Sequence, residues 1–276
     1  MTNYRLLVDM YVPQDDAPKF EERMGYFLNK KGGFRFFSPD FDNELVFALK
    51  GLAPSSPQDF KKTADIPAGK SPAARFLAAT QEPYRDPRPG SQAPLQHYVH
   101  LWTVPDLGDL DLAARMQFCS EDKEYMHLDE LVVQETQNFV RRVCWLEQPS
   151  KPQDDMHFVR ATRRLTYSKL GSYLLQLRAL TPSLKLRGWD QLGQFQAVTG
   201  TLNTVTEFWQ TKKLGALDPS SFAKGSHLGV RAMKVATDPI SVQLETFKFA
   251  PYFKPDSFRA LRSRFLQTRT SEKVSQ

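Results

Sequence analysis

Apolar residues recur along the chain at two spacings, one typical of amphipathic helices and one typical of strands. The helical spacing i, i+4, i+7 occurs twice, 150 residues apart, at Phe20, Met24 and Phe27 and again at Leu170, Leu174 and Leu177. Short runs rich in β-branched and aromatic residues lie before and after both helical segments, as expected for strands. The two series predict a chain built from two similar halves.

A ten-residue motif supports this internal repeat. The pattern W-x4-L-G-x-L-D begins at Trp102 and recurs 107 residues later at Trp209. A strand-like segment precedes each tryptophan, and another, with a Val-Gln step, follows each motif. Such self-similarity indicates a duplicated structural unit.

Each half is predicted to run strand, helix, strand, strand, helix, strand. In the first half we expect these elements at residues 4–12, 17–30, 33–49, 97–104, 108–127 and 130–142, with a break at Pro39. In the second half we expect them at residues 156–165, 167–180, 186–197, 202–210, 214–226 and 238–249. This βαββαβ order is that of the ferredoxin-like unit, a four-stranded antiparallel sheet with helices on one face.

The predicted fold class is therefore α+β, with two fused ferredoxin-like repeats whose antiparallel sheets cover each other's bare faces. We expect the first domain at residues 1–150 and the second at residues 151–276. The first repeat carries a Pro-rich insertion at about residues 51–96, which we expect to be a surface loop. The second ends in a C-terminal helix at residues 257–267.

Composition narrows the function classes. Lys and Arg total 37 against 31 Asp and Glu, a net charge of +6, but no nucleic-acid-binding motif accompanies the basic residues. We therefore expect no nucleic-acid partner and a small-molecule substrate instead. Cys119 and Cys144 are too few for a disulfide framework or a thiolate metal site. The sequence has no long apolar run and no secretory signal, which predicts a cytoplasmic protein without membrane insertion.

The strand before Trp102 places three candidate site residues on one face. Because side chains alternate along a strand, Tyr98, His100 and Trp102 share a face, whereas His97 points the other way. The aromatic side chains could form a pocket wall, and a histidine can move a proton near neutral pH. Alternatively, the tryptophan is a packing residue and His100 a core histidine. The opposite directions of His97 and His100 argue against a shared metal, and we predict no metal site.

The second half offers its own candidates. Glu207 stands two residues before Trp209, where the first half has His100 before Trp102. In a cavity this carboxylate could act as a base, whereas beside solvent or a basic neighbour it would be an ordinary charge. Arg160 could bind a carboxylate, phenolate or enolate of a substrate, or it could be an exposed strand residue.

These tryptophan strands resemble those of a known family. The segments GTLNTVTEFW at residues 200–209 and HLW at residues 100–102 resemble the LN-x-V-x-H-L-W strand of NIPSNAP-like proteins, members of the dimeric α/β-barrel superfamily. The family histidine is Glu207 in the second half, and the first half has Gln96-His97 in place of Leu-Asn. The resemblance implies a barrel completed within one chain, so we expect a monomer or a homodimer.

The superfamily includes cofactor-free monooxygenases and cyclases of aromatic polyketides, and haem enzymes related to chlorite dismutase. The resemblance thus implies a small-molecule enzyme of specialised metabolism. It would be an oxygenase, cyclase or rearrangement catalyst that acts on an aromatic or polyketide-like substrate without a tightly bound cofactor. The catalytic residues would be His100 and Glu207. The substrate would be bound by Tyr98, Trp102, Trp209 and Arg160.

Two alternatives remain open. The first is a haem-dependent enzyme on the same double barrel, in which the resemblance implies an axial histidine from the second half, either His157 or His227. The second is a non-catalytic binding scaffold, as the NIPSNAP-like resemblance also allows.

Overall fold

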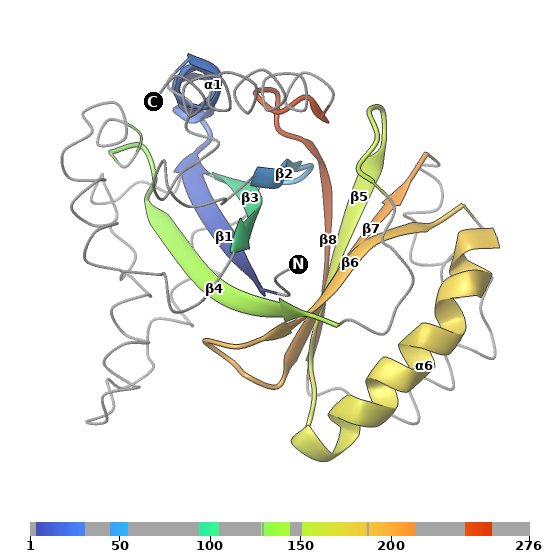
Figure 1. Ribbon diagram of the computed structural model, residues 1–276. Coiled ribbons are helices and arrows are strands. Elements are labelled where there is room, and N and C mark those ends of the chain that lie inside the picture. The colour runs from blue at the N-terminus through green and yellow to red at the C-terminus, as the bar shows by residue number, and fades with distance from the viewer. Residues whose placement is uncertain are drawn as a thin grey trace, which may run out of the picture.

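The structure of the protein, a computed structural model, describes residues 4–30, 45–54, 94–104, 128, 130–143, 151–186, 188–212 and 241–255. These residues form eight strands and two helices (Figure 1). The first half contains β1 (Tyr4–Pro13), α1 (Ala17–Lys30), β2 (Leu45–Gly51), β3 (Leu95–Val104) and β4 (Gln134–Arg142). The second half contains β5 (His157–Arg164), α6 (Tyr167–Leu186), β6 (Asp190–Ala197), β7 (Thr204–Thr211) and β8 (Ser241–Phe249).

The strands close into one antiparallel barrel in the order β1-β3-β2-β8-β5-β7-β6-β4, and β4 pairs with β1. Within each half the fourth strand lies beside the first, which lies beside the third, which lies beside the second. The predicted α+β class and the barrel within one chain are confirmed.

Two short strand pairings join the halves, and we call them the seams. The ladder between β1 and β3 contains ten residue pairs and that between β5 and β7 contains eight. By contrast, β2 and β8 pair only from Leu49 to Gly51, and β4 and β6 pair only from Val140 to Arg142. Side chains inside the barrel must therefore supply much of the contact between the halves.

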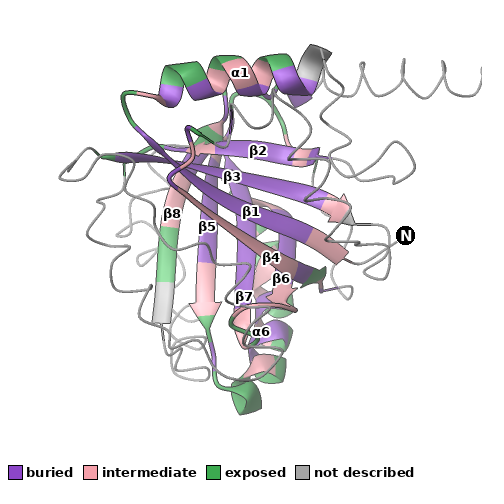
Figure 2. Cartoon of the chain, turned by 90° about the vertical axis from the view of Figure 1, so that its left-hand side faces the viewer, coloured by how far each residue is buried: buried purple, intermediate pink, exposed green. Residues whose placement is uncertain are grey.

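Most strands are buried on both faces because the barrel has an interior core and an outer layer beneath each helix, whereas β4 and β8 are buried less completely. Inside, the rings of Phe47 from β2 and Phe208 from β7 meet edge to face, with centroids 5.0 Å apart. Outside, α1 and α6 cover different halves of the barrel (Figure 1). Figure 2 shows both helices with buried residues toward the strands and exposed residues toward solvent. No helix in the described segments is long and apolar enough to cross a membrane.

Some predicted boundaries differ from those in the structure. Helix α6 continues to Leu186, although Pro182 lies inside it and prolines commonly end helices. Strand β6 consequently begins at Asp190 rather than at residue 186. Strand β4 begins at Gln134 rather than at residue 130, since the Leu131 amide bonds to the Leu128 carbonyl in a turn. Several predicted segments lie outside the described residues. These are the helices at 108–127, 214–226 and 257–267, residues 33–44 and most of the insertion.

Candidate functional site

The outer face of the barrel carries most of the predicted site residues that the structure describes, beneath the two helices. The Phe20 ring of α1 contacts the Tyr98 ring of β3 with centroids 4.8 Å apart, so the face shared by Tyr98 and His100 lies under α1. In the second half, the Tyr173 hydroxyl of α6 donates to Glu207 of β7, so the corresponding face lies under α6. The two sets of candidates therefore occupy separate sites, each between strands and a helix.

Glu207 is almost fully buried and is held by three donors. Its Oε1 accepts hydrogen bonds from the Tyr173 hydroxyl and from Arg163 Nε at 3.1 Å, and its Oε2 accepts one from Trp209 Nε1 at 3.0 Å. Burial, followed by the nearby Glu207 charge, raises the pKa of Tyr173 well above its ordinary value. The Arg163 guanidinium also lies over the Tyr173 ring, 5.7 Å from its centroid. These contacts stabilise a carboxylate anion in an apolar layer.

Unpaired amide groups surround this carboxylate. Gln194 of β6 lies directly opposite Glu207 and is 2% exposed, yet neither atom of its side-chain amide has a hydrogen-bond partner among the described residues. Gln191 Nε2 of β6 and Gln176 Oε1 of α6 are likewise buried without a partner. Unpaired buried polar atoms are uncommon in folded proteins and costly, so their concentration here marks a site that a ligand could complete.

A β-bulge puts two of these glutamines on the same face. Gln191 lies opposite Trp209 and Gln194 opposite Glu207, although the two glutamines are three residues apart. The register shifts between Gln191 and Gly193, which inserts one extra residue into β6. Without the bulge, strict alternation would turn Gln191 and Gln194 to opposite faces.

His100 is paired beneath α1. It is 2% exposed, and its Nε2 lies 2.8 Å from the Tyr252 hydroxyl. Burial lowers the pKa of His100 to about 3, so the imidazole is neutral at pH 7. On the same face, the Tyr98 hydroxyl donates to Glu21 Oε1 at 2.7 Å. Trp102 is buried in the core, with its ring 6.1 Å from that of His100.

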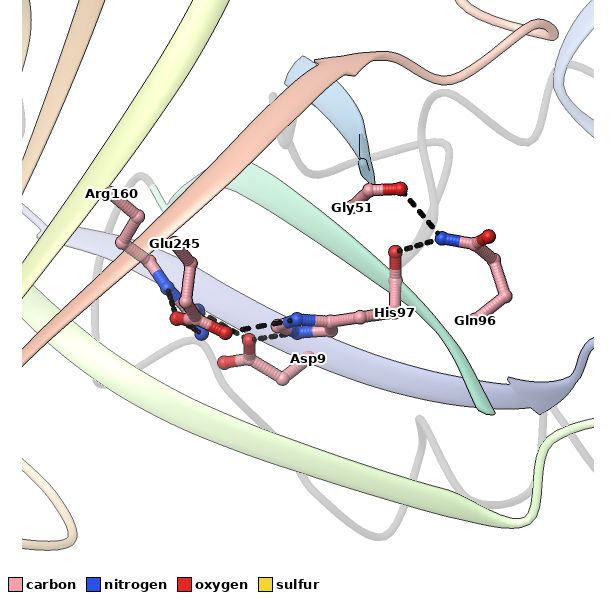
Figure 3. A network of polar contacts seen from close by, with 6 residues as sticks. All are labelled: Asp9, Gly51, Gln96, His97, Arg160 and Glu245. Carbon is pink, nitrogen blue, oxygen red and sulfur yellow. Dashed lines mark hydrogen bonds and ion pairs between the residues drawn. The ribbon is translucent and has the colours of Figure 1, made fainter. Parts of the chain in front are cut away.

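Arg160 lies on the other face of the sheet, inside the barrel, where it is buried rather than exposed. Its guanidinium donates to Asp9 of β1 and, through Nε, to Glu245 of β8 at 2.7 Å. His97 of β3 completes the group, with Nε2 2.8 Å from Asp9 Oδ1 and Nδ1 3.2 Å from Glu245 Oε1 (Figure 3). We call Asp9, His97, Arg160 and Glu245 the lumen cluster.

The lumen cluster connects the two halves of the barrel. Asp9 and His97 come from the first half, and Arg160 and Glu245 come from the second. Burial alone would raise the pKa of Asp9, but the Arg160 charge and the His97 hydrogen bond hold it at about 2. Burial would likewise raise the pKa of Glu245, and contacts with His97 and Arg160 keep it below its ordinary value. The two carboxylates that pair with the Arg160 guanidinium are thus the protein's own Asp9 and Glu245 side chains.

The haem-ligand candidates lie partly outside the described residues. His227 is not described. His157 pairs with Thr211 across β5 and β7, which places it on the outer face of the second half with Val159, opposite Trp209. Its Nδ1 is buried and has no hydrogen-bond partner among the described residues. An unpaired imidazole nitrogen is chemically suited to bind iron.

The sequence reasoning missed several site residues. Tyr173 and Gln194 belong to the α6 site, and Asp9 and Glu245 to the lumen cluster, but none of them lies in a motif. The pairing of Asp9 with Arg160, 151 residues away, has no local sequence signal.

The fold and site define an α+β barrel with a buried polar site beneath a helix of the second half. The sequence matches no protein-family model and no curated protein. The fold resembles that of a putative monooxygenase from Fusobacterium nucleatum, with a TM-score of 0.51, 10% sequence identity, and coverage of 90% of this chain and 93% of that one. At this identity the likeness shows the fold alone.

Two further solved structures have lower TM-scores. A putative monooxygenase from Lactobacillus acidophilus gives 0.49 at 6% identity, covering 89% of this chain and 93% of that one. A mutant chlorite dismutase from Candidatus Nitrospira defluvii gives 0.43 at 10% identity, covering 95% of this chain and 96% of that one.

Proposed function

We propose that the protein is a small-molecule monooxygenase of specialised metabolism that acts on an aromatic or polyketide-like substrate and needs no resident cofactor. The observation that carries this proposal is the buried Glu207 carboxylate with the unpaired amides of Gln194 and Gln191 beside it. A buried, partnered carboxylate surrounded by unused hydrogen-bonding groups is typical of a site that binds a polar ligand and moves a proton. The name of the Fusobacterium protein agrees with this class.

In this proposal Glu207 removes a proton from an acidic C–H or phenolic O–H of the substrate. Arg163 and Tyr173 both donate to Oε1, whereas Oε2 accepts one hydrogen bond, from the Trp209 indole, so the second lone pair of Oε2 is the one that accepts the proton. Trp209 and Trp189 belong to one buried cluster and provide apolar surface for an aromatic ring. Deprotonation makes the substrate electron-rich enough to react with dioxygen.

The overall reaction balances without another reductant. A methylene flanked by aromatic rings loses two hydrogens and becomes a carbonyl, a four-electron oxidation. Dioxygen accepts the four electrons, and one of its oxygen atoms enters the product while the other leaves as water. Glu207 takes the first proton and returns it to the departing oxygen.

We further propose that both halves are ferredoxin-like repeats. The support is the shared strand order and the W-x4-L-G-x-L-D motif that begins within β3 and β7. In this view His100 and Glu207 occupy equivalent places, and the second half has become the catalytic one because only there are amides left unpaired around the site, as far as the described residues extend.

The test is oxygen consumption with a tricyclic aryl ketone that carries a doubly benzylic methylene. We expect one ¹⁸O atom from ¹⁸O₂ in the product and a loss of about 100-fold or more in turnover for Glu207→Gln. Glu22→Gln, on the exposed face of α1, is the matched control and should leave turnover unchanged. Equal activity of both variants would contradict the role of Glu207. Absence of any turnover or ligand binding would favour the scaffold alternative.

The unpaired Nδ1 of His157 favours a second candidate, a haem-dependent enzyme. His157 would hold the iron, and the bound haem would supply the redox chemistry. Titration of the purified protein with hemin, followed from 300 to 700 nm, tests this. A stoichiometric Soret shift that His157→Ala abolishes would support haem binding, and a spectrum identical to free hemin would reject it.

A further inference from the structure

We propose that α6 is a movable cover and that Gln194, Gln191 and Gln176 beneath it are ligand-positioning groups, which become paired when the cover admits a ligand. The inference rests on the proposed function for the location of the site. It goes beyond that function by assigning a motion to α6 and a role to three side chains outside the acid/base machinery.

The closed arrangement leaves these amides without hydrogen bonds. Gln194 lacks partners for both its donor and its acceptor, Gln191 for its donor and Gln176 for its acceptor. Gln191 and Gln194 lie on the outer face of β6 and Gln176 lies on α6, so the three come from the two elements that would separate if α6 moved. Any movement of α6 that exposed these groups to water or a ligand would satisfy them, so their burial favours opening.

The apolar attachment of α6 is strongest in the middle of the helix, and partly buried Leu170 and Leu184 continue it toward both ends. Its fully buried side chains are Tyr173, Leu174 and Leu177, which lie within little more than one turn. Leu175 and Leu186 point to solvent, with exposed fractions of 56% and 90%. Both ends of α6 are therefore held by less buried apolar surface than its middle, and they can separate from the barrel at a smaller cost than the whole helix.

A polar contact fastens the cover in its closed position. The Tyr173 hydroxyl donates to Glu207 Oε1, and Arg163 lies against both residues. This contact uses the carboxylate that the proposed reaction needs. A ligand with a hydroxyl directed at Glu207 would compete with Tyr173, so ligand binding and release of the cover are coupled through one acceptor.

The unpaired groups also define the ligand. A glutamine amide presents a donor and an acceptor in one plane, and it pairs best with a ligand edge that carries an acceptor beside a donor. Gln194 offers both groups, and Gln191 adds a donor opposite Trp209. The site therefore suits a flat molecule with adjacent carbonyl and hydroxyl or N–H groups.

Hydrogen exchange of the α6 amides, measured by mass spectrometry without ligand, tests the cover. Gln194→Met removes the unpaired amide and should slow exchange in α6 at least 10-fold, while Tyr173→Phe should speed it at least 10-fold. Gln243→Met, at an exposed position of β8, is the matched control and should change nothing. Unchanged or faster exchange in Gln194→Met would overturn the proposal, because it would mean that water already pairs the amide in the closed state.

The role in positioning has a separate readout. With an active substrate, Gln194→Met should raise KM at least 10-fold and leave kcat within about two-fold, because the amide binds the substrate but moves no proton. An unchanged KM would overturn this role. The exchange experiment needs no substrate, so failure of the monooxygenase proposal and failure of the cover proposal are distinguishable.

Discussion

Glu207 and His100 occupy matching strand positions but differ in charge. Glu207 is a carboxylate held by three donors, whereas His100 is a neutral imidazole bonded to one tyrosine hydroxyl. The histidine of the first-half site, His100, thus resists protonation. The acid/base role expected for His100 stays a prediction, and its protonation behaviour can test it.

The pH dependence of stability reports that behaviour. The unfolded chain binds a proton at His100 as pH falls below about 6.5, whereas the folded protein does so only near pH 3, so acid favours unfolding. Between pH 6.5 and 3.5 we expect the wild type to lose about 1.4 kcal/mol per pH unit more than His100→Gln. Urea unfolding at three pH values measures the difference. Equal slopes would show that folded His100 takes up a proton, as an acid/base catalyst must.

For single residues, the sequence predicted the strand face that a side chain occupies better than it predicted the residues that the side chain contacts. Strand alternation correctly put Tyr98, His100 and Trp102 on one face and His97 on the other. It could not say that this face lies under α1, or that Arg160 meets Asp9 and Glu245. Those contacts depend on which strands oppose each other across the barrel, and this follows from the closed topology rather than from local pattern.

Strand β6 shows how one irregular element shapes the α6 site. The βαββαβ order of the repeat predicted a strand here, but not the bulge, because no residue of this polar segment marks an insertion. The bulge turns Gln191 toward α6 and brings Gly193 close to the Phe195 ring. A Cβ on Gly193 would lie 2.6 Å from that ring, whose packing in the core leaves it little room to move.

Two glycine substitutions test the packing at the bulge and the stability of α6 separately. We expect Gly193→Ala to lower the free energy of unfolding by about 1–3 kcal/mol, because the new methyl overpacks the core. Gly171→Ala, inside α6 with nothing within 4 Å of the new methyl, should raise it by about 0.5–1 kcal/mol through helix propensity. Chemical denaturation of both variants measures these values. A stable Gly193→Ala protein would mean that the bulge can shift.

At the scale of the whole molecule, the lumen cluster ties together halves whose seams are short. β1 and β5 stand on opposite sides of the barrel, so the ion pair between Asp9 and Arg160 crosses its interior. Periodicity and repetition predicted the order of the strands and of α1 and α6, and the family resemblance implied the barrel in one chain. The sequence did not predict the cluster, whose members are spread from residue 9 to residue 245.

Acid should weaken this connection. The pKa of Asp9 is about 2 in the folded protein and near 3.8 otherwise, so its contribution is present above about pH 3.8 and is lost as pH falls through 2. We expect the stability difference between wild type and Asp9→Asn to shrink by about 2 kcal/mol from pH 5 to pH 2. Urea unfolding measures it, with exposed Asp154→Asn as the control. A constant difference in the free energy of unfolding would show that Arg160 does not stabilise the ionised form of Asp9.

The closure of the barrel also bears on aggregation. Each described strand has a neighbour on both sides, so none offers a free edge onto which another chain could add a strand. Self-association by strand addition must therefore begin with the parting of a seam, where three residue pairs hold the edge closed. Conditions that dissociate the lumen cluster, strong acid above all, are thus the conditions under which this protein should form β-rich aggregates.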